Sequence, residues 1–177
     1  GLRAGNTEPM RQQDKDYIRS AWTRVGTATG QPFDMNFFAR EGFVYDTEPA
    51  CRAVVTARRL MPHMALPFMA RLQQAFYAEA RNVTRPEVLA DLAGTLGLPR
   101  ADFARALASQ AMRDATLADF RQSQAWGIRG FPALIAEHDG ALHLVAQGYL
   151  PVGALRVDHG DVRIDRPRGL EGPLRPV

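Results

Sequence analysis

The chain contains a single cysteine, Cys51, among its 177 residues. One cysteine cannot close an internal disulfide or build a metal site of several thiolates. These residues therefore hold no Cys-x-x-Cys motif, which supplies the attacking and resolving thiols of disulfide exchange. The histidines lack metal-ligand spacing backed by cysteine, so we expect no metal site and no cofactor. They are His63, His138, His143 and His159.

Long apolar runs are also missing from the sequence. No stretch of about 18 uncharged apolar residues occurs, which is the length that a membrane-spanning helix needs. Residues 1–6 lack the apolar segment of a secretory signal. We therefore expect no membrane-spanning segment and no membrane partner.

The sequence has only a small excess of positive over negative charge. The sequence has 22 Lys and Arg residues against 19 Asp and Glu residues, a net charge of +3, and Lys15 is its only lysine. The cations are spread along the chain between acidic residues, whereas nucleic-acid-binding domains concentrate them in a patch. We expect no nucleic-acid partner.

Helical periodicity dominates residues 8–125. Apolar residues recur at spacings of three and four, as on the buried faces of about six helices. Thr47-Glu48-Pro49 predicts a helix start in which the Thr47 hydroxyl caps free amides. Thr84 and Glu87 have the spacing of a capping box, in which each side chain satisfies a backbone donor.

The periodicity changes after Gly127. Residues 133–136 and 142–146 are predicted to be short strands, and the Asp139-Gly140 step between them favours a hairpin. Residues 156–177 are rich in Arg, Asp, Gly and Pro without a sustained apolar period. We expect them to form a poorly ordered tail.

The segment Gly127-Ile128-Arg129-Gly130-Phe131-Pro132 joins the helical block to the first predicted strand. A small residue, a hydrophobic residue and proline leading into a strand resemble the substrate-binding loop of thioredoxin folds. With the helix start at residues 46–53 and the stretch at residues 1–6, this loop resembles the DsbA-like branch, especially its cytoplasmic predicted protein-disulfide isomerases. The resemblance covers residues 1–149.

The resemblance implies an α/β class, namely a thioredoxin-like fold with a large inserted all-helical domain. Residues 1–7 would end the first thioredoxin half, residues 8–110 would form the insertion, and residues 111–155 would form the second half before the tail at 156–177. It also implies that the first strand and the active-site helix, with the catalytic cysteines, precede Gly1. On this interpretation the chain is truncated and contains no catalytic residue.

The resemblance also implies a site. The peptide bond before Pro132 would be cis, and the main chain of Phe131 would pair with an extended cysteine-containing peptide or thiol ligand. Arg129, Gly130, Phe131 and Pro132 are therefore the expected substrate-binding residues. The expected partner is a protein or small molecule that carries a thiol or disulfide, and the expected location is cytoplasmic.

Two other functions remain open on the sequence. The chain could be a redox-inactive thioredoxin-fold protein that binds peptides. Alternatively, it could resemble kappa-type glutathione transferases and 2-hydroxychromene-2-carboxylate isomerases, which share the inserted helical architecture but use bound glutathione and a serine-containing active site.

Cys51 lies on the apolar side of its predicted helix with Val54 and Val55, as expected of a small buried hydrophobic residue.

Overall fold

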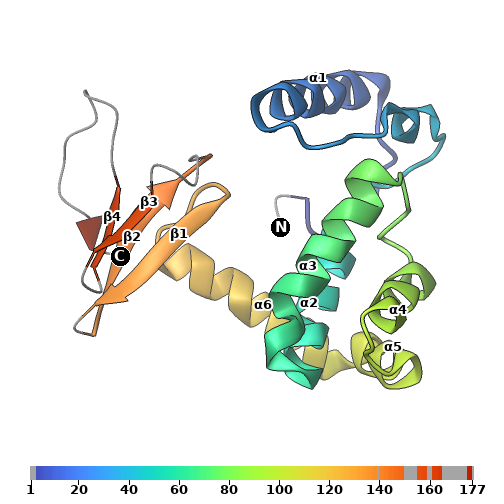
Figure 1. Ribbon diagram of the computed structural model, residues 1–177. Helices are drawn as coiled ribbons and strands as arrows, with labels where there is room; N and C mark the ends of the chain where they lie inside the picture. Colours follow the sequence, from blue (N-terminus) through green and yellow to red (C-terminus); the bar gives the residue numbers. More distant parts are fainter. Residues whose placement is uncertain (1–2, 139, 150–154, 159–160, 165–174, 177) are drawn as a thin grey trace. The chain divides into compact units, whose positions relative to one another are not determined.

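The computed structural model describes residues 3–138, 140–149, 155–158, 161–164 and 175–176. The chain forms two compact units, residues 1–118 and residues 119–177 (Figure 1). The boundary between the units, at residues 118 and 119, lies inside a helix. The sequence predicts that the inserted domain ends earlier, at residue 110. The assignment of the parts as an insertion and a thioredoxin half remains a prediction.

The first unit is helical, as the periodicity predicts. Its helices α4 and α5 pack against α2, and α3 packs against both α2 and α4. In chain order the helices are α1 (Gln12–Thr29), η1 (Met35–Ala39), α2 (Glu48–Leu60), η2 (Pro62–Met64), α3 (Ala65–Gln73), the π-helical turn η3 (Gln74–Ala78), α4 (Pro86–Thr95), α5 (Arg100–Ala108) and α6 (Gln110–Ala125), which continues into the second unit.

The predicted cap of α2 is wrong in its acceptor. The Thr47 hydroxyl oxygen accepts a hydrogen bond from the Arg3 amide (3.3 Å) and makes no cap bond. The Asp46 carboxylate accepts instead from the Glu48 amide (2.9 Å) and from the Gly5 amide (2.9 Å). A short acidic side chain two residues before the first helical amide therefore does the capping.

The predicted capping box of α4 is also wrong. The amide and hydroxyl of Thr84 both donate to the side-chain oxygen of Asn82, at 3.0 and 2.6 Å. Arg85 is the residue that precedes the helix, and its guanidinium pairs with Glu87 at 2.5 Å. Thr84 thus belongs to a turn closed by Asn82, because asparagine readily bonds the backbone two residues on.

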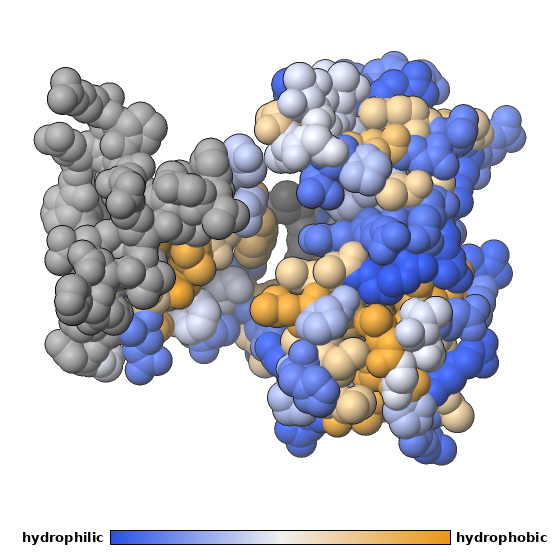
Figure 2. Space-filling model, in the orientation of Figure 1, coloured by the Kyte–Doolittle hydropathy of each residue, from blue (hydrophilic) through white to orange (hydrophobic). Residues whose placement is uncertain are grey.

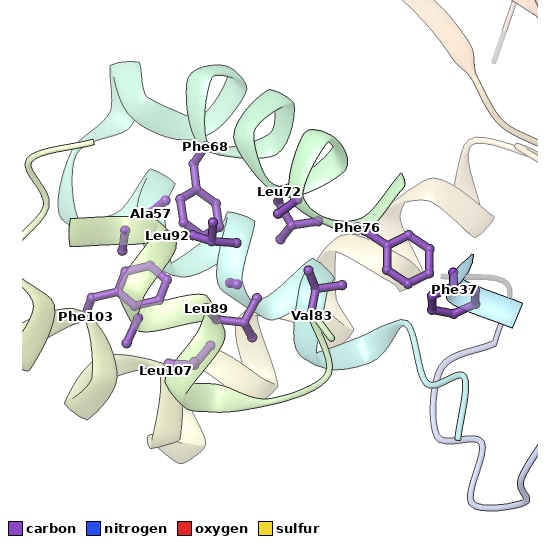
Figure 3. Close-up of a cluster of buried hydrophobic side chains, with 14 of the residues drawn as sticks. Phe37, Ala57, Phe68, Leu72, Phe76, Val83, Leu89, Leu92, Phe103 and Leu107 are labelled. Atoms are coloured by element: carbon purple, nitrogen blue, oxygen red, sulfur yellow. The ribbon is translucent and has the colours of Figure 1, made fainter. Parts of the chain in front are cut away.

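Apolar side chains of α2 to α5 form the core of the helical unit. Figure 3 shows them pointing toward one another between the helices, with Phe76 beside Phe37 at one end. Trp22 of α1 lies against a group of aromatic rings at centroid distances of 4.8–5.7 Å, which attaches α1 to the rest of the unit. These rings are Phe33, Phe37, Phe38, Phe76 and Tyr77.

The second unit contains the predicted hairpin. Strands β1 (Ala133–His138) and β2 (Ala141–Gln147) are antiparallel, and Gly140 in the turn has φ +74°, which glycine adopts without strain. Among the described residues, β5 (Arg175–Pro176) pairs with the other edge of β2.

Strands β3 (Leu155–Asp158) and β4 (Asp161–Ile164) form a separate antiparallel pair. The sequence did not predict them, since they lie at and within the stretch expected to be poorly ordered. The remainder of that stretch, residues 159–160, 165–174 and 177, lies outside the described residues.

The visible face of the helical unit is mostly hydrophilic with apolar side chains between (Figure 2). One of the exposed apolar side chains of this unit is Leu66 of α3, which is 71% exposed. None of the helices described by the structure has the length and apolarity to cross a membrane.

We expect Leu89→Ala to lower the free energy of unfolding by about 2–5 kcal/mol, because it opens a cavity in a fully buried position. Leu66→Ala is the matched control and should change stability by less than about 0.5 kcal/mol. Urea unfolding followed by far-ultraviolet circular dichroism measures both. Equal effects of the two substitutions would contradict the packing described here.

Two tyrosines of the helical unit should make its stability depend on alkaline pH. Tyr45 and Tyr77 both pack against the Phe76 ring, at centroid distances of 5.5 and 4.9 Å. Burial raises the pKa of both phenols; for Tyr45, Tyr77 adds to the rise while the Arg3 cation lowers it. The unfolded chain therefore loses these protons first.

We expect the contribution of this pair to be complete below about pH 10 and to be lost as pH rises above it, by at most about 1.4 kcal/mol per pH unit for each tyrosine. Urea unfolding between pH 8 and pH 11 measures the loss. A variant with Tyr45→Phe and Tyr77→Phe should lose less free energy of unfolding over this pH range. An unchanged loss would show that the two tyrosines do not cause it.

Candidate functional site

The end of α6 sets the start of the candidate loop. The Gly127 amide donates to the Gln124 carbonyl (2.9 Å), and the Ile128 amide donates to the Ser123 carbonyl (3.1 Å). Gly127 itself has φ +68°. This pair of bonds around a left-handed glycine is a Schellman motif, which ends a helix and turns the chain out of it.

The other end of the loop is attached to the hairpin. The Pro132 carbonyl accepts a hydrogen bond from the Gly148 amide (2.8 Å), and the next residue, Ala133, pairs with Gln147. The peptide bond between Phe131 and Pro132 is cis. The loop is thus held between a terminated helix and a hydrogen-bonded strand.

The main chain of Phe131 is open between these two attachments. In the part of the chain that the structure describes, neither its amide nor its carbonyl makes a hydrogen bond. The residue as a whole is 60% exposed. An amide and a carbonyl at an accessible position can pair with an extended ligand in the manner of one more strand residue.

The four predicted site residues lie together on this loop. Arg129, Phe131 and Pro132 are exposed, and Gly130 is half-buried. These residues are consecutive in the sequence, so finding them together does not test whether they bind a ligand. Their role in binding remains a prediction.

One neighbour of the loop was missed by the sequence reasoning, because it comes from the end of β2. A Cβ at Gly130 would lie 3.6 Å from Nε2 of Gln147. The hairpin prediction contained the necessary signal, since the end of the second strand returns to the start of the first. The predicted strand stopped at residue 146, one residue short of Gln147.

Cys51 lies apart from this loop in sequence and belongs to the helical unit, near the start of α2. It is half-buried, and this burial raises the pKa of its thiol. The thiol form therefore predominates at neutral pH, whereas a nucleophilic cysteine needs a lowered pKa. Among the described residues, no group of three or more His, Cys, Asp or Glu side chains is placed to hold a metal ion.

The sequence from residue 4 to residue 159 matches the model of the DSBA-like thioredoxin domain family. The chain belongs to this family. Its helix-rich structure with a small antiparallel hairpin is accordingly a thioredoxin-like fold with added helices. A search of curated proteins finds no match.

Solved structures agree with the family assignment. A proposed protein disulfide isomerase from Nitrosomonas europaea is 38% identical, with a TM-score of 0.81 over 85% of this chain and 74% of that one. The cytosolic disulfide reductase DsbM from Pseudomonas aeruginosa is 29% identical, with a TM-score of 0.69 over 81% of this chain and 72% of its own. A structure of DsbM with GSH is similar to this chain at 27% identity, with a TM-score of 0.67 and the same coverage.

We expect Gly127→Ala to destabilise the chain by about 1–2 kcal/mol, because alanine is strained at the left-handed φ that ends α6. Gly130→Ala is the matched control. Its φ lies outside the left-handed region, and the added methyl would make an ordinary contact with Gln147. Thermal unfolding of both variants tests this, and a Gly130→Ala variant that loses as much stability as Gly127→Ala would contradict it.

Proposed function

We propose that this chain recognises cysteine-containing thiols and disulfides through the loop Arg129–Pro132, as part of a DsbA-like thiol-disulfide oxidoreductase or isomerase. The observation that supports this most is the main chain of Phe131, which makes no hydrogen bond within the described residues and belongs to an exposed residue next to the anchored Pro132. Membership of the DSBA-like family supports a ligand that carries a thiol or disulfide.

The loop would bind its ligand chiefly through main-chain atoms. An extended peptide can donate one amide to the Phe131 carbonyl and accept one hydrogen bond from the Phe131 amide, which fixes its direction and register. Such bonds do not depend on ligand side chains, so the site would accept many cysteine-containing sequences. The exposed Arg129 guanidinium adds an attraction for ligands that carry a carboxylate.

Disulfide exchange itself needs an attacking thiolate and a second thiol that resolves the mixed disulfide. These 177 residues contain only Cys51, whose half-buried thiol has a raised pKa. The contribution that we assign to this chain is therefore substrate recognition, with no catalytic residue among its own side chains.

Glutathione is a second candidate ligand of the same loop. It is itself a cysteine-containing peptide, and one similar structure is that of DsbM with GSH. DsbM is described as cytosolic, which agrees with the cytoplasmic location that we propose for this chain.

The blocked peptide acetyl-Ala-Cys-Ala-amide, kept reduced, should shift the NMR amide signals of residues 129–131 and 133, which flank Pro132. Phe131→Pro removes the amide donor. The substitution should weaken binding by about 3- to 10-fold, the change in affinity expected from the loss of one hydrogen bond. Phe131→Ala keeps the donor and is the control for loss of the ring. Signal shifts confined to residues 12–108, or none, would reject the loop as the site.

The chain should not accelerate the reduction of insulin by dithiothreitol, because Cys51 has no resolving partner and is half-buried. Turbidity of precipitating insulin measures the rate against dithiothreitol alone. Cys51→Ser should give the same trace as the unmodified chain. A faster reaction that Cys51→Ser abolishes would show that this cysteine is catalytic after all.

A further inference from the structure

Gln147 contributes the atom that a Cβ on Gly130 would meet. Its Nε2 atom is 3.6 Å from the position that a Cβ at Gly130 would occupy, so the missing methyl leaves the carboxamide directly beside the backbone. Gln147 is exposed at the end of β2. Its carboxamide can therefore exchange water for a ligand without first leaving a buried position.

The hairpin register holds this arrangement in place. Gln147 pairs across the ladder with Ala133, and the following amide, Gly148, bonds the Pro132 carbonyl at 2.8 Å. This register and this one hydrogen bond tie the end of β2 to the strand that follows the loop. The carboxamide thus lies beside Gly130, the residue before Phe131. The main-chain amide and carbonyl of Phe131 make no hydrogen bond within the described residues.

A glutamine carboxamide presents one donor group and one acceptor in a plane, the same set as a peptide bond. It can therefore make a hydrogen bond to a main-chain amide of the ligand whether that ligand offers its N–H or its C=O. An alkanethiol without other polar groups offers neither this donor nor this acceptor. A hydrogen bond from Gln147 would therefore distinguish peptidyl cysteine from such a thiol.

We propose that Gln147 is a second substrate-contact residue, whose carboxamide hydrogen-bonds the peptide group next to the ligand cysteine and so favours peptidyl cysteine over thiols without amides. This inference rests on the proposed function of the loop, and it adds a residue and a ligand preference to it. It applies equally to protein segments and to glutathione, because both carry peptide bonds on each side of cysteine.

The test is an NMR titration of the full 177-residue chain with two ligands, acetyl-Ala-Cys-Ala-amide and ethanethiol, which has no hydroxyl or amide. The side-chain NH2 signals of Gln147 should shift with the peptide and stay fixed with ethanethiol. Gln147→Ala should weaken peptide binding by about 3- to 10-fold, as expected for one hydrogen bond. Gln13→Ala, at an exposed position of α1, is the matched control and should leave the affinity unchanged.

Different outcomes test the role of Gln147 and the binding of the ligand by the loop. If the peptide shifts the loop amides but leaves the Gln147 side-chain signals fixed, or if Gln147→Ala binds the peptide as the unmodified chain does, the role of Gln147 is wrong while the loop remains the site. If no loop amide shifts with the peptide, the proposed function itself fails. Shifts of the Gln147 signals in the unmodified chain decide the question even where the substitution perturbs folding.

Discussion

The hydrogen-bonded ladder between β1 and β2 is the constraint on which the candidate site depends. Its register places Gln147 opposite Ala133 and brings the Gly148 amide to the Pro132 carbonyl. A slip of one residue would move these partners to other positions and turn their side chains to the other face. The Gly140 turn and the register shift between Leu134 and Ile135 therefore determine which atoms surround Phe131.

A second constraint acts from the helix side. Gly127 ends α6 by a backbone conformation that other residues adopt only with strain, and the chain then has four residues, 128–131, before Pro132 is attached to the hairpin. Both ends of the loop are thus fixed by main-chain bonds. A loop held in this way can present an open amide and carbonyl in one geometry, which reduces the entropy lost when a ligand pairs with them.

Much of the fold could be predicted because helical periodicity sums over many residues. Apolar spacing located the helical block, and the Asp139-Gly140 step located the hairpin. Single hydrogen bonds were harder to predict, because Asp46 accepts at the start of α2 where Thr47 was expected to, and Thr84 donates to Asn82 instead of capping α4. Only the folded geometry selects between such neighbouring side chains. Strands β3 and β4 were missed because four residues are too few to show a period against a background of Arg, Asp and Gly.

The candidate loop could be predicted from its local order of residues, whereas Gln147 could not, because its place beside Gly130 depends on the exact register of the hairpin. The central claim is that this end of the hairpin holds the ligand. The most direct measurement uses a cysteine-containing peptide with a nitroxide spin label at one end and records the paramagnetic broadening of amide signals. The account predicts the strongest broadening at residues 129–133 and 147–149. Broadening concentrated in residues 12–108 would contradict it.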